Sequence, residues 1–390
     1  MKAGRKRKKI PLFDLKVSPQ ARKQVRTVLK SGWLTTGPVT EALEAAMARY
    51  LGIKHIAAVN SATAGLYLAL RALGVGKGDS VVTTPFTFIA TVEAILLAGA
   101  QPLFADIEPR TLNIDPQKVT SVIRKNTKVI LPVDIAGFPA DYARLTAIGR
   151  DRSLYLLADS AHAIATRIGN RTPAHFADAA VYSLYSTKNL TCGEGGLVVS
   201  RRKSLADRVR RLARHGLTSG TYERQQKKRW DYDAVEFGFK ANMSDVHAAI
   251  GLGQLTRLEQ DQTKREGIAK RYARNLSDYG EFLQLPPDDP RIRHGRHLYI
   301  IRLDLSRLKI DRDRFIRLMA DRGIECGVHY KPVFELSYYR KSLRLSNRSF
   351  PNAAAAGRSV VSLPLYPGLS PAETNYICQS IVDILRAHSR

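Results

Sequence analysis

The sequence contains few cysteines and no long apolar stretch. Its three cysteines, Cys192, Cys326 and Cys378, lie far apart among 390 residues and form neither a CxxC pair nor a metal-ligand spacing. No uninterrupted apolar run is long enough to span a bilayer, and no apolar core follows the charged N-terminus as it would in a secretory signal. We therefore predict a cytoplasmic protein with reduced cysteines, no bound metal and no membrane insertion.

Acidic residues are also scarce. The chain has 35 Asp and Glu but 62 Lys and Arg, which gives a net charge of +27. Six of the basic residues lie between positions 2 and 9, so +21 remains on the rest of the chain. A positive field of this size speeds encounter with anionic ligands but carries no information about the fold. Since the basic residues are dispersed and no nucleic-acid module is recognisable, we interpret them as a solubilising surface, with nucleic acid or an anionic membrane as the lesser alternative.

Between residues 55 and 200, short β-branched runs alternate with longer helical patterns. The patterns predict strands at 55–60, 80–85, 102–107, 127–135 and 153–160, and helices at 61–73, 88–100 and 115–125. Strands separated by helices of this length are joined by right-handed crossovers, so the predicted fold class is α/β with a mostly parallel sheet covered on both faces. Ligands of such sheets bind beyond the carboxyl ends of the strands.

A chain of 390 residues is longer than one hydrophobic core usually serves, which predicts two domains that share a cleft. We expect a large domain at 1–255 and a smaller α+β domain at 256–390. Within the smaller one, a strand-like run at 297–305 is followed by a helical pattern at 312–322.

Three local signals complete the outline of the fold. Ser18 and Pro19 predict a helix start ahead of the main sheet, because serine caps helices and proline suits their first position. The basic tail at 1–10 is expected to be disordered. The stretch at 217–236 lacks periodicity and is predicted to be a mobile loop at a domain or subunit boundary.

The segment most indicative of chemistry is 177–200, where Ser183 and Lys188 lie between two apolar runs and ahead of a glycine-rich turn. A lysine between hydrophobic strands is partly desolvated, which lowers its pKa and makes its amine nucleophilic toward an aldehyde. The glycines would allow a flat cofactor to approach the backbone closely. Taken alone, an exposed lysine in a turn is an equally good interpretation.

An acidic residue ends a neighbouring apolar strand, because Asp159 follows the run at 155–158. A carboxylate in such a place needs a cationic partner, and a protonated pyridine nitrogen would supply one. The simpler alternative is an aspartate that caps the next helix. His162 lies three residues further on, where it could contact the same ring, although a lone histidine is more often structural.

Two further segments indicate a cofactor site only when they are considered together with Lys188 and Asp159. Ala62 and Thr63 begin the helix that follows the first strand, and free amides at a helix start bind anions such as phosphate. Phe88 follows the next strand and could stack on a pyridine ring. Each feature has an ordinary alternative, a plain helix cap for the first and a core phenylalanine for the second.

Eight motifs, in this order and spacing, resemble those of the DegT/StrS-type sugar aminotransferases over nearly the whole chain. The motifs are SGWLTTGP at 31–38, NSATAGL at 60–66, TPFTF at 84–88, ADSAHA at 158–163, SLYSTKNLTCGEGG at 183–196, GFKANMSDVHAAIGLGQL at 238–255, GVHYKP at 327–332 and SLPLYPG at 362–368. The resemblance implies a pyridoxal-phosphate enzyme with the aspartate-aminotransferase type of fold, fold type I.

The resemblance also implies a role for individual residues. Lys188 would bind the cofactor covalently and Asp159 would pair with its pyridine nitrogen. The other implied cofactor contacts are His162 to the phenolic oxygen, Phe88 stacked on the ring, and Ala62, Thr63, Ser183 and Asn242 around the phosphate. In this family the last of these comes from the neighbouring subunit, so the resemblance implies a homodimer with shared active sites.

A departure near Asn242 bears on the substrate. Many relatives have Asn-Tyr-Arg where this chain has Lys240-Ala241-Asn242, a pattern that looks more like the branch that aminates UDP-linked 4-keto sugars, including an enzyme of lipid A modification. A cationic Lys240 near a diphosphate makes electrostatic sense. The residues that fall where family members meet the sugar nucleotide are Trp33, Thr35, Lys240, His329 and Tyr330, and ordinary surface or interface roles are equally good interpretations.

The resemblance therefore predicts an aminotransferase that moves an amino group from an amino acid, with glutamate as the expected donor, to a nucleotide-linked keto sugar, most closely a UDP-4-keto sugar. Two alternatives stay open. One is a dehydratase that uses pyridoxamine phosphate, which the presence of Lys188 disfavours because such relatives lack this lysine. The other is a regulatory protein that keeps the cofactor pocket without turnover.

Overall fold

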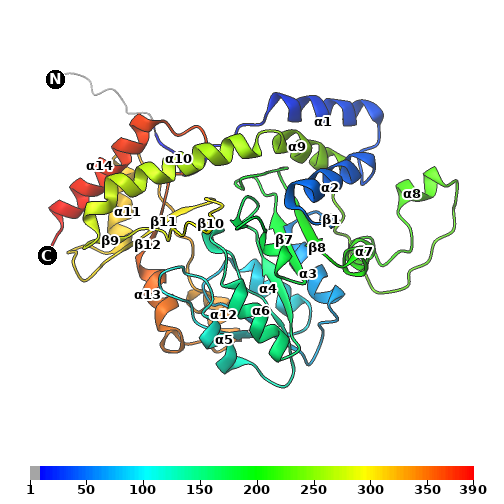
Figure 1. Cartoon of the computed structure of the whole chain (residues 1–390), viewed down its shortest axis with the longest axis horizontal. Coiled ribbons are helices and arrows are strands. Elements are labelled where there is room, and N and C mark those ends of the chain that lie inside the picture. The colour runs from blue at the N-terminus through cyan, green and yellow to red at the C-terminus, as the bar shows by residue number, and fades with distance from the viewer. Residues whose placement is uncertain (1–8) are drawn as a thin grey trace.

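The computed structural model describes residues 9–390, and a seven-stranded sheet forms the centre of the molecule (Figure 1). Its spatial order is β1-β8-β7-β5-β4-β2-β3. The strands are β1 His55–Val59, β2 Ser80–Thr83, β3 Gln101–Phe104, β4 Thr127–Ile130, β5 Tyr155–Asp159, β7 Ala179–Ser183 and β8 Gly196–Ser200. All pairings are parallel except those of β8, which runs antiparallel to both β1 and β7. The predicted mostly parallel α/β sheet is confirmed, and each predicted strand forms in a shorter version.

Helices cover both faces of this sheet, as the sequence predicts. The helices of this region are α1 Pro19–Ser31, α2 Pro38–Leu51, α3 Ala62–Ala72, α4 Ala90–Leu97, α5 Pro116–Val122, α6 Tyr142–Asp151, α7 Lys203–Leu212, α8 Thr221–Gln226 and α9 Asp245–Leu255. Leu156 and Ala158 of β5 pack in the core with α2 and α6, while Leu157 between them packs in the core with α3, α4 and α7. Alternate side chains of a strand point to opposite faces, so both faces are buried.

Caps fix where the first helices begin. Ser18 Oγ accepts a hydrogen bond of 3.1 Å from the amide of Ala21, with Pro19 at the first position of α1, as predicted. Ser61 Oγ accepts a bond of the same length from the amide of Ala64 at the start of α3. A side-chain oxygen in this position satisfies one of the amides that a helix start leaves without an intrahelical partner.

The C-terminal part contains a second core. The strands and helices here are α10 Leu258–Leu276, β9 Leu283–Gln284, β10 Ile292–Arg293, β11 Tyr299–Leu303, α11 Arg312–Asp321, α12 Ser337–Ser342, α13 Pro351–Ser359, β12 Val360–Leu363 and α14 Pro371–Ala387, and β10 pairs with β6 Arg167–Ile168. Strands β12, β11 and β9 form a small antiparallel sheet, which packs with α10, α11 and α14. The division into domains at residue 255 stays a prediction.

The N-terminal residues differ partly from expectation. Positions 1–8 of the predicted disordered tail lie outside the described residues. Ile10, however, is buried in the C-terminal core and forms a parallel bridge with Ile324, while Lys9 pairs with Glu325. Ile10 is thus held in place by apolar burial, which the charged residues around it did not lead us to expect.

The aperiodic segment 217–236 projects from the body of the molecule (Figure 1). It contains one short helix, α8, which the sequence reading did not predict. Trp230 is 87% exposed and Phe237 just beyond the segment is 83% exposed. Both side chains therefore face solvent in the single chain.

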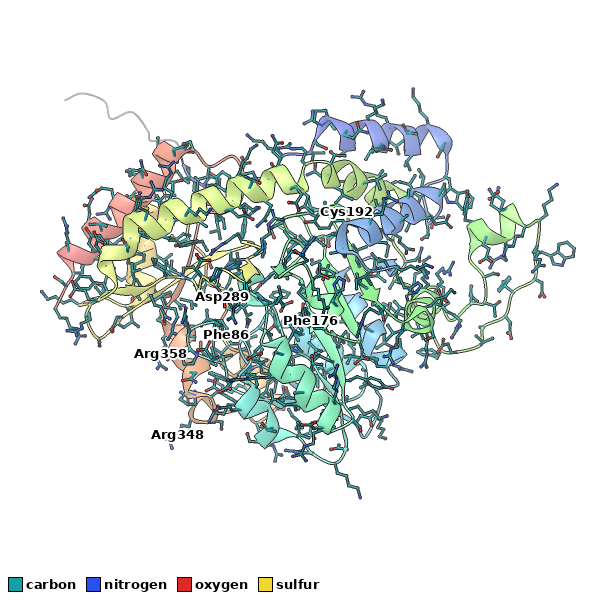
Figure 2. All side chains as sticks on the ribbon, viewed as in Figure 1. Phe86, Phe176, Cys192, Asp289, Arg348 and Arg358 are labelled. Carbon is teal, nitrogen blue, oxygen red and sulfur yellow. The ribbon has the colours of Figure 1, made fainter. Side chains whose placement is uncertain are left out.

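Buried side chains fill the space between the elements (Figure 2). All three cysteines are free, and Cys192 is fully buried, where it packs against the place of the absent side chain of Gly251 on α9. Among residues 9–390, no group of His, Cys, Asp and Glu is arranged to hold a metal ion. Nor does any helix in that range have the length and apolar character needed to cross a membrane.

Candidate active site

A cavity of about 580 Å³ lies at the carboxyl ends of β1, β5 and β7, where the fold predicts a ligand site. It collects most of the residues that the sequence singles out. The predicted site residues that line it are Ala62, Thr63, Phe88, Asp159, His162, Ser183, Lys188, His329 and Tyr330. These residues come from five separate segments of the chain, which the tertiary structure brings together.

Asp159 ends β5 and is only 5% exposed. Its Oδ2 accepts a hydrogen bond of 2.8 Å from the Thr91 hydroxyl, and its Oδ1 accepts one of 3.2 Å from the amide of Ala161. Burial raises the pKa of this carboxyl, and these two bonds and the Lys188 charge oppose the rise. A carboxylate held in this way favours a cation beside it, because an unpaired buried charge is costly.

Lys188 lies in the loop between β7 and β8, and its side chain lines the same cavity as Asp159. Burial lowers the pKa of its amine to about 8, although the negative charge of Asp159 acts in the opposite direction. The predicted desolvation of this amine is therefore present. At pH 8 about half of the Lys188 amines are neutral and able to act as a nucleophile or base.

His162 and Tyr330 form a hydrogen-bonded pair whose protons can be placed. The amide of Ala136 donates to His162 Nδ1 at 3.2 Å, so a neutral ring carries its proton on Nε2. Burial, with the Lys188 and His329 charges, lowers the pKa of His162 well below its usual range and keeps the ring neutral. Nε2 then donates to the Tyr330 oxygen at 2.9 Å. The hydroxyl proton of Tyr330 is left to donate to a ligand.

His297 is a cavity residue that the sequence reading missed. Asn189 uses its amide nitrogen to donate to Gly295 O at 2.6 Å, so its oxygen faces His297 Nδ1 at 3.2 Å and accepts from it. His297 Nε2 is then an acceptor, and the ring centroid lies 4.5 Å from that of His162. Burial and the Lys188 charge lower its pKa well below the usual range. The only sequence signal was its place as the first residue of the strand-like run at 297–305.

The start of α3 forms an anion-binding end of the cavity. Ser61 caps the helix through Ala64, and no hydrogen-bond acceptor for the amides of Ala62 and Thr63 is found between residues 9 and 390. Strand β8 comes so close that a side chain at Gly196 would lie 2.7 Å from the Ala62 nitrogen. Glycine at this position therefore leaves the helix start accessible. Two free amides at a helix N-terminus suit a phosphate.

These groups fit the cofactor that the motifs imply. A phosphate matches the Ala62 and Thr63 amides together with the Ser183 hydroxyl, and a cationic ring nitrogen matches the buried Asp159 carboxylate. Phe88 is 57% exposed although it lines a cavity, so one face of its ring is free to stack on a flat ligand. The arrangement accommodates pyridoxal phosphate.

The remaining predicted residues gather elsewhere, around the loop between α1 and α2. Asn242 donates from its amide nitrogen to the Thr36 hydroxyl and accepts from Lys240 Nζ at 2.6 Å. The indole of Trp33 donates to the Thr36 carbonyl at 3.1 Å, and its ring lies 5.2 Å from that of Tyr222. We call Trp33, Thr35, Lys240 and Asn242 the loop cluster. None of the four lines the cavity that contains Lys188.

Comparison with known proteins identifies one family and relatives that match over nearly the whole chain. A family described as the DegT/DnrJ/EryC1/StrS aminotransferase family matches residues 16–382. The spore coat polysaccharide biosynthesis protein SpsC of Bacillus subtilis is 38% identical over 93% of this chain and 94% of its own length. The uncharacterised protein MJ1066 of Methanocaldococcus jannaschii is 34% identical over 97% and 96%.

Solved structures of sugar aminotransferases have the same fold as this chain. The PLP form of Spr1654 from Streptococcus pneumoniae, described as a sugar aminotransferase, has a TM-score of 0.91 and 30% identity, and the match covers 97% of this chain and 99% of that one. PseC of Helicobacter pylori, an aminotransferase involved in the biosynthesis of pseudoaminic acid, has a TM-score of 0.90 and 26% identity over 97% and 100%.

Proposed function

This chain belongs to the DegT/DnrJ/EryC1/StrS aminotransferase family, and on that premise we propose that it transfers an amino group from glutamate to a UDP-linked 4-keto sugar. The protein is a sugar aminotransferase that depends on pyridoxal phosphate, as its family and structural neighbours are. The observation that carries the proposal is the convergence of Lys188, Asp159 and the free amides of α3 on one cavity. A retained lysine disfavours the dehydratase and regulatory alternatives.

In this proposal the cavity residues each hold one part of the cofactor. Asp159 binds the ring nitrogen and keeps it protonated, while Ala62, Thr63 and Ser183 bind the phosphate. Phe88 stacks on the ring, and Tyr330, oriented by His162, donates its free proton to a ligand oxygen. When bound, the cofactor supplies an aldehyde that accepts the amino group and an electron-poor ring that stabilises negative charge at the reacting carbon.

Lys188 moves the proton in both halves of the proposed reaction. Its Nζ removes the proton from the α-carbon of the amino donor, and later returns a proton to the sugar carbon that receives the nitrogen. An amine with a pKa of about 8 is suited to both tasks near neutral pH, because its protonated and neutral forms are both populated. Because one site serves two substrates in turn, the kinetics are expected to be ping-pong.

The loop cluster provides the remaining contacts in the proposal. Asn242 of the partner subunit reaches the phosphate, and Trp33, Thr35 and Lys240 meet the sugar nucleotide with His329 and Tyr330. Two observations support this. Asn242 does not line the cavity of its own chain, and the neighbouring segment exposes Trp230 and Phe237. A homodimer that covers these side chains would complete each cavity, and the net charge of +27 favours a substrate with a diphosphate.

The test is a panel of nucleotide-linked 4-keto and 3-keto sugars, each incubated with glutamate and the holoenzyme in a cytoplasm-like buffer. We expect a UDP-linked 4-keto sugar to be aminated fastest, with the position and orientation of the new amine read by NMR. Such a product would serve polysaccharide or lipopolysaccharide synthesis. If no sugar in the panel is aminated while the cofactor stays bound, the regulatory alternative replaces the proposal.

A further inference from the structure

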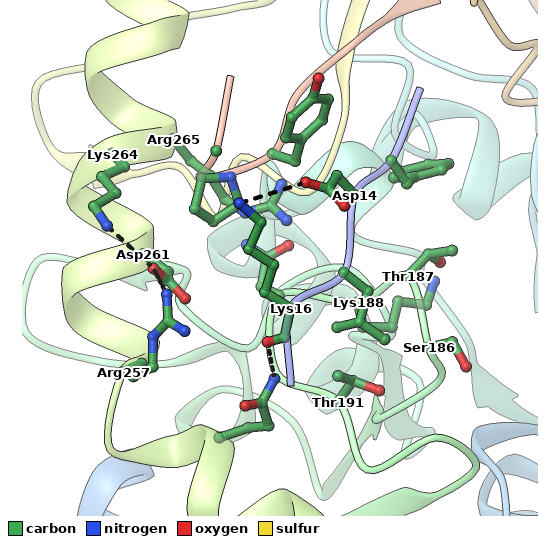
Figure 3. A pocket seen from close by; sticks show the side chains of 17 residues that line it. Asp14, Lys16, Ser186, Thr187, Lys188, Thr191, Arg257, Asp261, Lys264 and Arg265 are labelled. Carbon is green, nitrogen blue, oxygen red and sulfur yellow. Dashed lines mark hydrogen bonds and ion pairs between the residues drawn. The ribbon is translucent and has the colours of Figure 1, made fainter. Parts of the chain in front are cut away.

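A second cavity, of about 350 Å³, adjoins the catalytic lysine (Figure 3). Lys188, Thr187 and Phe13 line both cavities, whereas Asp159, His162 and the start of α3 line only the larger one. The smaller cavity is bounded by the segment 13–16, the loop 186–191, helix α10 and the turn 366–368. Of the residues that line the larger cavity, only these three also line the smaller one.

The lining of this second cavity is strongly basic. Five basic side chains face two acidic ones. The basic residues are Lys16, Lys188, Arg257, Lys264 and Arg265, and the acidic residues are Asp14 and Asp261. The acids are already engaged, because Asp261 pairs with Arg257 at 3.2 Å and Lys264 at 3.8 Å, and Asp14 lies 4.0 Å from Lys16.

Arg265 is the decisive residue because its charge is buried and forms no ion pair with an acidic residue within residues 9–390. The side chain is only 5% exposed. Its Nη1 donates to the Leu365 carbonyl at 2.8 Å and to the Arg296 carbonyl at 3.4 Å, while its Nε finds no acceptor in the part of the chain that the structure describes. Carbonyls orient the guanidinium but do not neutralise it, and burial accordingly lowers its pKa to about 10.

A buried guanidinium held in place by carbonyls is pre-organised to bind an oxyanion, because it presents parallel donors in a fixed fork. Lys16 and Lys264 reach the same cavity from its exposed side and add two flexible positive charges. The volume of about 350 Å³ suits a small molecule and is well below that of the neighbouring cavity, at about 580 Å³.

We propose that this cavity is a second ligand site, which binds a small dianion through its carboxylate or phosphate groups with Arg265 as the anchor. The proposal depends on the residues of this cavity and is independent of which sugar the enzyme aminates. Because the bound anion lies against Lys188, it favours the protonated amine, and its occupancy and the proton on Lys188 are linked reciprocally. A filled site therefore slows a step that needs the neutral amine.

The test is isothermal titration calorimetry on the holoenzyme with inorganic phosphate in one arm and glutarate in the other. The holoenzyme is used because its cofactor phosphate already fills the amide end of the larger cavity, and glutarate has no amine to transfer. We expect one of the two to bind with a stoichiometry of one per chain. Arg265→Met should weaken that binding at least about tenfold, as expected for a lost charge-assisted bond to a buried group.

Two further variants keep the test decisive. The double variant Lys16→Met, Lys264→Met removes two exposed charges and should weaken binding about threefold or more. It keeps the proposal testable if Arg265→Met fails to fold. Lys270→Met, an exposed lysine on the same helix, is the matched control and should leave binding unchanged. Tighter glutarate binding assigns the site to a dicarboxylate, and tighter phosphate binding assigns it to phosphate.

The coupling to Lys188 has a separate readout. With the tighter-binding anion present, the pH profile of amino transfer should move to higher pH, and Arg265→Met should abolish that shift. The proposal is overturned if neither anion binds at millimolar concentration, or if both sets of variants bind as tightly as the unmodified protein. Failure of this test would leave the amination of a nucleotide sugar unaffected, so the two proposals stand or fall separately.

Discussion

The cavity around Lys188 and the loop cluster carry residues from the same set of motifs, yet they differ in how complete they are. In the cavity, Asp159 is 5% exposed and His162 is 6% exposed, and each has defined hydrogen-bond partners within the chain. The loop cluster is more open, because the Lys240 side chain is exposed and Phe239 beside it in the chain is 52% exposed. In the cavity the chain itself supplies burial and fixed hydrogen-bond partners, whereas the loop cluster keeps part of its surface in contact with solvent.

Removal of the amine should have the largest effect. Lys188→Ala is expected to lower glutamate-dependent amination at least about 10³-fold, because the variant loses both the covalent anchor and the proton-transfer group. Activity is measured by product formation, and the anchor by loss of the absorbance of covalently held cofactor. Lys118→Ala on the exposed face of α5 is the matched control. Near-normal turnover without Lys188 would place the chemistry outside this cavity.

Replacement of the buried carboxylate should have the next largest effect. Asp159→Asn keeps the size of the side chain and an oxygen for the Thr91 hydroxyl, but it removes the negative charge that holds a ring nitrogen protonated. We expect kcat to fall on the order of 10²-fold, with a smaller change in cofactor affinity. The measurement is steady-state kinetics beside a cofactor titration. An unchanged kcat would mean that Asp159 acts only as a structural cap.

A third experiment asks whether the loop cluster serves a different chain. Asn242→Ala should weaken cofactor binding about tenfold, because one hydrogen bond to a charged phosphate is lost. When this variant is mixed with Lys188→Ala at limiting cofactor, hybrid dimers with shared sites contain one intact site and should recover activity. Each variant alone is the control. No recovery after verified subunit exchange would show that Asn242 serves its own chain or no site.

The smallest expected effect concerns stability without cofactor. The pKa of Lys188 is about 8 in the folded chain and 10.5 ordinarily, so the unfolded chain binds more protons between these values. The cost of burying the charge is therefore fully present below about pH 8 and disappears as the pH rises through 10.5. Lys188→Met should raise the free energy of unfolding at pH 7 by about 1 kcal/mol, since Lys188 is only half-buried.

Chemical denaturation of the cofactor-free protein at pH 7 and near pH 10 checks this result. The gain from Lys188→Met should shrink at the higher pH, whereas Lys118→Met should change little at either. A gain of the same size at both values would show that packing, and not charge, explains it.

The outline of the large sheet and the identity of its key residues could be predicted from sequence. Strand runs such as 155–159 bury alternate residues on both faces, so local composition was sufficient to identify them. Lys188 and Asp159 were singled out by their place beside apolar strands and by the resemblance of the surrounding motifs to a known family, and their catalytic roles stay predictions. The antiparallel direction of β8 was not predicted, since direction depends on which strand lies beside it and not on its own residues.

The amino-acid sequence by itself determined where most of the strands and helices form, because that property depends on neighbours within a few positions, and it singled out the side chains that we propose as catalytic. Only the tertiary structure decided that Thr91 would bond Asp159, that His297 would face His162, and that the Arg265 guanidinium would be buried with no acceptor for its Nε among residues 9–390. These residues are far apart in the chain. Their pKa values and protonation depend on contacts across the fold, which no local pattern records.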